Sequence, residues 1–271
     1  MKKERRTYPL LSYTDFSTQL LDTYDLDPIY YMLVRADLAD DVLYRWLLAY
    51  WCYYHAGVAS LLAEITDSNE YYERMYDGVK DWPRGAERRY FRGKDAYRAV
   101  DYLRSFGSPE KVVAHMIEHK TFDAVSKHAQ EFVLFGPWIS WKIADMAERV
   151  VAIPVDFSEA NLFMYKDPVM GAALVKHGDY NQKMSSDELE EVVYDTLSNF
   201  GHRMAPPYDD RPVNIQEVET FLCKWKSHYR GSYPLYKDTM EITERLMDWG
   251  DLAEDLHTYM LELKPKNQVG D

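Results

Sequence analysis

Residues 135–156, with the sequence FGPWISWKIADMAERVVAIPVD, are the starting point for the fold of this chain. Apolar residues at helical spacing lie on both sides of Gly136-Pro137, over residues 122–133 and residues 139–150. Glycine tolerates a left-handed turn, and proline is favoured at the first helical position. The segment therefore predicts two helices joined by a very short hairpin. The outward-facing amides of such a hairpin can bind an anion, and a carboxylate, Asp156, follows the second helix.

This arrangement resembles the helix-hairpin-helix element of base-excision DNA glycosylases. The resemblance implies that Gly136, Pro137 and Trp138 bind a DNA phosphate and that Asp156 serves the chemistry. The alternative is an ordinary corner of a helical bundle, in which Asp156 is a helix cap or a solvated residue.

The composition indicates a globular protein of 271 residues with 46% hydrophobic and 15% aromatic residues. This length fits one helical domain over residues 1–271, or two packed helical lobes with the cleft between them. No apolar run is long enough to span a membrane, and no apolar signal core follows the basic start. With only Cys52 and Cys223, we expect no disulfide framework, no metal site, no cofactor and a reducing cytoplasm.

Helical patterns dominate the chain, and strand-like alternation is nearly absent, so the predicted fold class is all-α. Cap residues and apolar spacing predict helices over residues 40–62, 109–119, 121–135, 139–150, 186–200, 214–229 and 236–263. Segments rich in glycine, proline and aspartate predict loops at residues 77–85, 168–184 and 205–212.

The net charge of −13 argues against a protein that coats nucleic acid, but the positive charge is concentrated in two segments. Residues 84–94 and residues 220–237 each carry a local charge of +4, which leaves −21 on the rest of the chain. This distribution indicates a focused anion site.

The first basic segment carries Arg84, Arg88, Arg89 and Arg92. On a helix, Arg88 and Arg92 lie one turn apart on the same face, with Arg89 beside them. Guanidinium groups bind phosphate oxygens bidentately, so the cluster is a candidate phosphate or pyrophosphate site. The alternative is a solvated basic helix face.

The second basic segment alternates basic and aromatic residues. On a helix, Lys224 and His228 share one face, and Trp225 and Tyr229 share another. Basic groups beside aromatic rings suit a nucleotide base with its phosphate, so Lys224 and Lys226 are candidate phosphate ligands. His228 has the titration range for proton transfer. The alternative is a helix with packed aromatic residues and solvated lysines.

Three segments together carry a family resemblance: PRGAERRYFRG at residues 83–93, the 135–156 segment, and FLCKWKSHYRGSYPLYKD at residues 221–238. They resemble the bacteriophage alpha-glutamyl/putrescinyl thymine pyrophosphorylases, also called amino acid:DNA transferases. The resemblance covers roughly residues 15–245 and implies the helical glycosylase-type fold.

The resemblance implies a reaction on DNA that contains 5-hydroxymethyluracil activated as a pyrophosphate ester. The enzyme would act in the infected bacterial host cell, expel pyrophosphate and attach an amino acid or polyamine through its amine. The target base must leave the helical stack, and the arginine cluster would neutralise the leaving group. The amine must lose a proton, for which Asp156 or His228 are candidate bases.

Two further residues are candidate nucleophiles. Lys142 begins a Lys-Ile-Ala-Asp sequence that resembles the Lys-Val-Ala-Asp of bifunctional 8-oxoguanine glycosylases, but an alignment on Gly136 places Trp138 there instead. The alternative for Lys142 is a solvated or ion-paired lysine. Cys223, beside Lys224 and near His228, would have a depressed pKa if those groups are close in space, and could then add to C6 of the uracil. The alternative is direct displacement by the amine with no covalent step, and Cys52 is expected to be inert.

Two other functions remain open at this point. One is a DNA glycosylase that excises a modified base, and the other is a non-catalytic phage protein that binds DNA through its basic segments.

Overall fold

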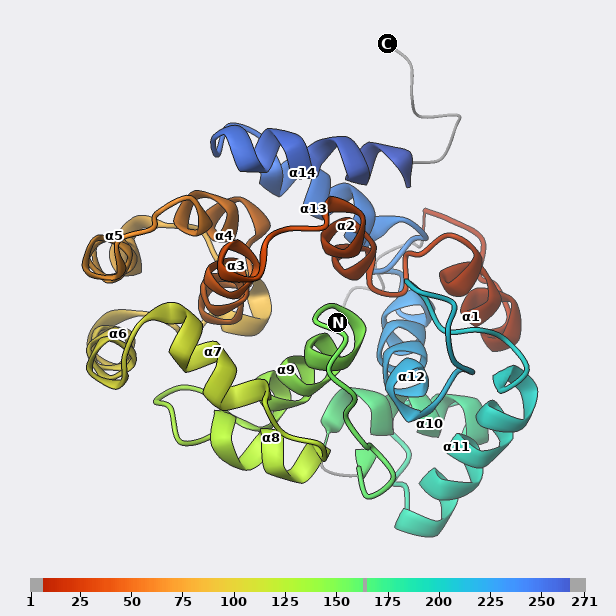
Figure 1. Cartoon of the computed structure of the whole chain (residues 1–271). Coiled ribbons are helices and arrows are strands. Elements are labelled where there is room, and N and C mark those ends of the chain that lie inside the picture. The colour runs from red at the N-terminus through yellow and green to blue at the C-terminus, as the bar shows by residue number, and fades with distance from the viewer. Residues whose placement is uncertain (1–6, 163–164, 264–271) are drawn as a thin grey trace. The chain divides into compact units, whose positions relative to one another are not determined.

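The computed structural model describes residues 7–162 and 165–263, and within them the regular secondary structure is helical (Figure 1). No strand longer than an isolated bridge occurs in these residues. The predicted all-α fold class is confirmed. None of the described helices is long and apolar enough to cross a membrane.

The chain divides into two compact units. Unit 1 comprises Met1–Tyr31, Phe157–Met240 and Leu263–Asp271, and unit 2 comprises Met32–Asp156 and Glu241–Glu262. Helices α2 (Pro28–Ala36) and α13 (Lys237–Leu246) each contribute residues to both units.

Unit 1 is built around helix α12 (Ile215–Tyr229), which packs against α1 (Tyr13–Asp22), α10 (Lys166–His177) and α11 (Ser186–Phe200). Gly171 allows the close approach of α10 to α12, because a Cβ atom there would lie 2.0 Å from the carbonyl oxygen of Leu222. The apolar core of this unit contains Phe16, Leu20, Leu21, Leu26, Leu174, Phe200, Val213, Phe221, Trp225 and Tyr233.

Unit 2 contains the remaining helices around an aromatic core that includes Trp46, Trp51 and Trp141. Its helices are α3 (Asp40–Tyr53), α4 (Ala56–Ala63), α5 (Ser68–Asp81), α6 (Gly93–Phe106), α7 (Pro109–Ile117), α8 (Phe122–Ala129), α9 (Pro137–Arg149), α14 (Asp251–Glu262) and the 3-10 turn η1 (Ala86–Arg88).

Several predicted helix starts are confirmed by cap hydrogen bonds. The side chains of Ser108, Thr121 and Ser185 each accept a backbone N–H at the start of α7, α8 and α11. Asn214 does the same at the start of α12, where Glu217 completes a capping box. Residues 205–212 contain no helix, as predicted.

Other boundaries were predicted wrongly. The segment 40–62 forms two helices, because Tyr54 adopts a left-handed conformation (φ 52°) and His55 caps α4. The segment 236–263 also forms two helices, separated at Gly250 (φ 103°). The predicted loops at 77–85 and 168–184 are partly helical, within α5 and α10. In the helical parts of these segments, proline lies in the first turn of a helix and glycine lies at a packing contact. Neither residue type therefore marks a loop there.

Candidate functional site

The two helices predicted around Gly136 are present, but their connection is longer than expected. Helix α8 ends at Ala129, and residues 130–136 connect it to α9. The helix ends early because Phe132 N–H bonds to Ala129 O and Phe135 N–H to Phe132 O, which are tight turns. Gly136 is then the N-cap of α9 and Pro137 its first residue, as predicted. The likeness to the glycosylase hairpin stays a prediction.

Asp156 is exposed. It lies at the end of the α8–α9 pair that is opposite to the 130–136 connection. Its backbone N–H donates to Lys120 O at 2.7 Å, and its carbonyl oxygen accepts from Phe122 N at 2.9 Å. These bonds place Asp156 beside the first residue of α8, whereas the 130–136 connection follows the last one. Eight residues of helix separate the two ends, which is a rise of about 12 Å.

Arg88 is the buried member of the arginine cluster. Its Nε donates to Cys52 O at 3.2 Å and one terminal nitrogen donates to Leu134 O at 2.7 Å, so it links the end of α3 to the 130–136 connection. The other terminal nitrogen, NH2, is buried without a hydrogen-bond partner. No carboxylate of the described residues pairs with this guanidinium, and burial lowers its pKa.

The neighbouring arginines have different surroundings. Arg84 is partly buried and donates to the carbonyl oxygens of Val79, Trp82 and Phe91, so its guanidinium stabilises the end of α5. Arg89 and Arg92 are exposed. The expected helical face is wrong, because η1 ends at Arg88 and α6 begins only at Gly93.

A pocket of about 550 Å³ lies where the first basic segment meets the connection between α8 and α9. Arg88 and Phe91 line it from one segment, and Gly136, Pro137 and Trp138 line it from the other. Glu87 is the acidic residue of its lining. Two of the three motif segments, about 50 residues apart in the sequence, therefore form one pocket in unit 2.

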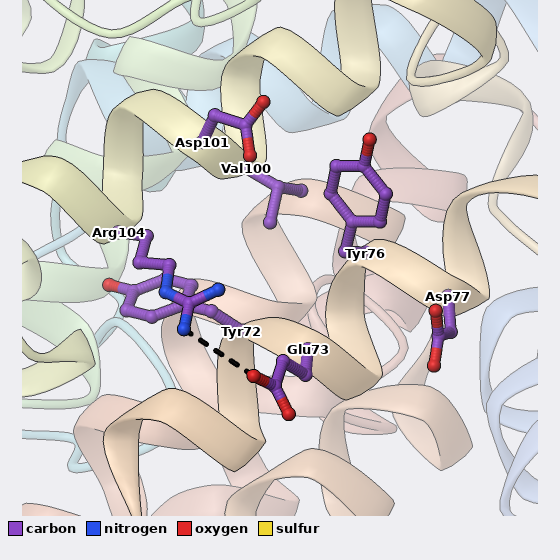
Figure 2. A pocket seen from close by; sticks show the side chains of 7 residues that line it. All are labelled: Tyr72, Glu73, Tyr76, Asp77, Val100, Asp101 and Arg104. Atoms are coloured by element: carbon purple, nitrogen blue, oxygen red, sulfur yellow. Dashed lines mark hydrogen bonds and ion pairs between the residues drawn. The ribbon is translucent and has the colours of Figure 1, made fainter.

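A second pocket of unit 2, of about 400 Å³, has the opposite charge (Figure 2). Glu73 and Asp77 from α5 and Asp101 from α6 line it together with Arg104, whose guanidinium lies 3.4 Å from Glu73. Figure 2 shows Arg104 extended toward Glu73. Because its lining has three carboxylates and one guanidinium, this pocket disfavours phosphate. No sequence signal identified it, since its residues come together only when α5 packs against α6.

In the second basic segment, the two candidate lysines form ion pairs within unit 1. Buried Lys224 lies 2.6 Å from both Asp25 O and a carboxylate oxygen of Asp238. Although burial opposes it, these acidic partners raise the pKa of Lys224. Lys226 is also buried, 2.6 Å from Asp167. The alternative of solvated lysines is therefore wrong, and phosphate binding by Lys224 and Lys226 stays a prediction.

His228 is buried and hydrogen-bonded through both ring nitrogens. Nδ1 lies 2.8 Å from Tyr233 O, and Nε2 accepts from Leu11 N at 3.3 Å. The ring stacks between Phe16 and Tyr8. Because one nitrogen must donate and the other accept, these contacts favour the neutral imidazole. A structural role of His228 accounts for these contacts, and they do not require it to transfer a proton.

Cys223 does not have the depressed pKa expected from its sequence neighbours. Burial, together with Glu219 and Asp167, raises the pKa of its thiol despite the two nearby lysines. The core position expected for Cys52 is confirmed, because it is fully buried and burial raises its pKa to about 12.

Lys142 is buried in α9 and ion-paired within the same helix. Its Nζ lies 3.4 Å from a carboxylate oxygen of Asp145, and both residues are buried. Lys142 was interpreted as a nucleophile, a solvated lysine or an ion-paired lysine. The ion-paired lysine matches this geometry. A role of Lys142 as a nucleophile stays a prediction.

One group of the described residues has donor atoms suited to a metal ion, although the cysteine count predicted none. It consists of His115, His128 and Glu131. Sequence reasoning missed it because these residues come from α7, α8 and the following connection.

Comparison with known proteins agrees with the motif segments. A sequence model of the family described as amino acid:DNA transferase matches residues 16–233. A glycinyltransferase of Pseudomonas phage PaMx11 is 40% identical, over 94% of this chain and 96% of that protein. A putrescinyltransferase of Delftia phage PhiW-14 is 27% identical, over 92% of this chain and 82% of that protein. The resemblance drawn from the three segments is confirmed, and the chain belongs to the amino acid:DNA transferase family.

Proposed function

We propose that this protein transfers an amine to a modified thymine base of bacteriophage DNA, in the cytoplasm of the infected host. The substrate is 5-(pyrophosphoryloxymethyl)uracil in DNA, and the second product is pyrophosphate. Family membership supports the transfer. The observation that carries the substrate class is Arg88, a buried guanidinium without a carboxylate partner among the described residues, in the lining of a pocket.

Glycine is the first donor to test. The relative with 40% identity over nearly its whole length is a glycinyltransferase, and the putrescinyltransferase is more distant. Both names describe donors with a primary amine, which fits one reaction with different donor pockets.

The reaction forms a bond between the amine nitrogen and the 5-methylene carbon and breaks the bond from that carbon to the pyrophosphate oxygen. Pyrophosphate leaves with the electron pair, and the amine loses a proton. Arg88 stabilises the charge that develops on the leaving group, because a buried cation acts in a medium of low dielectric. The exposed guanidinium groups of Arg89 and Arg92 add to the local positive charge.

Asp156 is the residue that we assign to proton acceptance, since its side chain is exposed while His228 is held in a neutral hydrogen-bonded state. The rise of about 12 Å along α8 separates Asp156 from the connection that lines the pocket. Arg88 and Asp156 therefore contact either the opposite ends of one pyrophosphorylated nucleotide or two neighbouring nucleotides. In the second case Arg88 would contact a backbone phosphate.

Mass spectrometry of nucleosides tests the proposal. Duplex DNA with 5-(pyrophosphoryloxymethyl)uracil is incubated with the protein and with glycine, other amino acids or putrescine, and is then digested to nucleosides. We expect a nucleoside whose mass equals thymidine with the donor attached through nitrogen. Release of a free base with an abasic site would instead show a glycosylase. Unchanged DNA with every donor, while the protein still binds the duplex, would show a non-catalytic binder.

A further inference from the structure

Four polar side chains lie close together in unit 2, and none of them is assigned to the reaction. His115 and His119 lie at the end of α7, His128 lies in the last turn of α8, and Glu131 follows in the connection. The rings of His119 and His128 stack with their centroids 4.0 Å apart. His119 Nε2 also lies 2.9 Å from the backbone oxygen of His115.

Three of these residues, His115, His128 and Glu131, each offer one donor atom that lies within 4.8 Å of the other two. His115 Nε2 lies 3.3 Å from His128 Nδ1 and 2.8 Å from one carboxylate oxygen of Glu131. His128 Nδ1 lies 3.2 Å from the other carboxylate oxygen of Glu131. Zinc binds histidine nitrogen and carboxylate oxygen at about 2.0–2.1 Å, so tetrahedral ligands of one ion lie roughly 3.3 Å apart. The separation of the two ring nitrogens, 3.3 Å, equals this spacing, and the nitrogen–oxygen separations of 2.8 and 3.2 Å, to different oxygens of Glu131, lie close to it.

The surroundings also suit a metal ion. Two ring nitrogens that face each other at 3.3 Å need a shared proton or a shared cation between them. Phe106 and Phe132 pack against the ring of His115 and restrict its movement.

We propose that His115, His128 and Glu131 bind a divalent transition-metal ion of the zinc class, with the fourth position open. Two histidines and one glutamate form a known ligand set for zinc, and three protein ligands leave one position free. The ion links α7, α8 and the connection that continues to Gly136. Since Gln130 and Phe132 of this connection line the pocket beside Arg88, the ion stabilises one wall of that pocket.

Direct metal binding tests this site without reference to activity. The untagged full-length protein is freed of metal and titrated with Zn²⁺ by calorimetry, and with Co²⁺ by visible absorption. We expect one ion per chain and a cobalt spectrum typical of four-coordinate geometry. Removal of a ligand in His128→Ala should weaken zinc binding by at least about 100-fold, since changes to outer-shell groups alone cost 10–100-fold.

A matched control is available in unit 1. His177 lies 3.3 Å from Glu188, so it offers a histidine–carboxylate pair that belongs to no group of three metal-binding donors among the described residues. His177→Ala should therefore leave zinc binding unchanged. The exposed Glu131 allows a second ligand variant, Glu131→Gln, which keeps the side-chain shape and should lose binding with an unchanged circular dichroism spectrum.

Zinc should also raise the thermal unfolding temperature of the wild type and of His177→Ala, but not that of Glu131→Gln. Equal zinc affinity in the wild type and in folded Glu131→Gln would overturn the proposal. Binding weaker than millimolar in the wild type would overturn it too, because isolated surface histidines bind metals at that level.

Discussion

The two basic segments carry the same local charge of +4, yet they differ in what their charges contact. In residues 220–237, Lys224 and Lys226 are buried against Asp238 and Asp167 and stabilise unit 1. In residues 84–94, the hydrogen bonds of buried Arg88 go to carbonyl oxygens, no carboxylate of the described residues pairs with it, and it lines a pocket of unit 2. The buried cations of the two segments thus differ in whether a carboxylate pairs with them.

The largest expected effect is on turnover in Arg88→Ala. Loss of one stabilising contact to a developing anion costs about 10²–10³-fold in rate, or roughly 3–4 kcal/mol in the barrier. We expect kcat to fall by this amount with the pyrophosphorylated duplex, while the Kd for unmodified duplex changes little. Arg89→Ala is the matched control, because Arg89 is exposed and its reduction in kcat should be small.

Thermal unfolding and duplex binding of Arg88→Ala are measured alongside, because Arg88 also links Cys52 O to Leu134 O. Arg88→Lys keeps the charge and should regain part of kcat. If Arg88→Ala keeps kcat and loses affinity for every duplex, the guanidinium contacts a backbone phosphate and not the leaving group.

In the second segment, the corresponding change should affect stability. Lys224→Met leaves Asp25 and Asp238 without their cation, and breaking a buried ion pair costs roughly 3 kcal/mol. Urea unfolding measures this loss. Lys226→Met should cost less, about 1 kcal/mol or below, because its partner Asp167 is half exposed. A folded Lys224→Met protein of wild-type stability that has lost turnover would reverse the contrast between the two segments.

A pH-dependent effect is expected from His55 of unit 2, whose Nδ1 accepts from Val58 N at 3.3 Å. Burial and the nearby Arg245 lower the pKa of His55 to about 4. The unfolded chain takes up this proton near pH 6.5, so the folded state loses stability as the pH falls from about 6.5 to 4. The loss is at most about 3 kcal/mol. Urea midpoints across this range should fall in the wild type and fall less in His55→Asn, which keeps a cap acceptor.

The smallest expected effect is that of Cys223→Ser. Because the pKa of Cys223 is raised, its thiol is neutral at physiological pH and is a poor nucleophile. We expect a change in kcat of no more than about twofold. An abolished rate together with a trapped protein–DNA adduct in the wild type would instead establish covalent catalysis by Cys223.

Local signals predicted much of the fold, because they act within a few residues. Ser108, Thr121 and Asn214 mark helix starts through cap hydrogen bonds, and Gly136-Pro137 marks the start of α9. The break at Tyr54 was missed, since apolar spacing continues through it and its cause is the left-handed conformation and the cap from His55.

The site was less predictable, because its properties depend on contacts between distant residues. Lys224 donates to the backbone oxygen of Asp25, which lies 199 positions away in the sequence. Arg88 reaches Leu134 across 46 positions, and the two motif segments form one pocket only through such contacts. His115, His128 and Glu131 likewise converge only through the packing of α7 against α8.

The central claim is that amine attachment and pyrophosphate release are a single coupled reaction. Isotopically labelled glycine incorporated into DNA and pyrophosphate released into solution are therefore counted in the same sample, with 5-(pyrophosphoryloxymethyl)uracil duplex as substrate. We expect one pyrophosphate released for each glycine incorporated. Both quantities should fall together in Arg88→Ala. Pyrophosphate released without incorporation of any donor, or glycine incorporated without pyrophosphate release, would contradict this account.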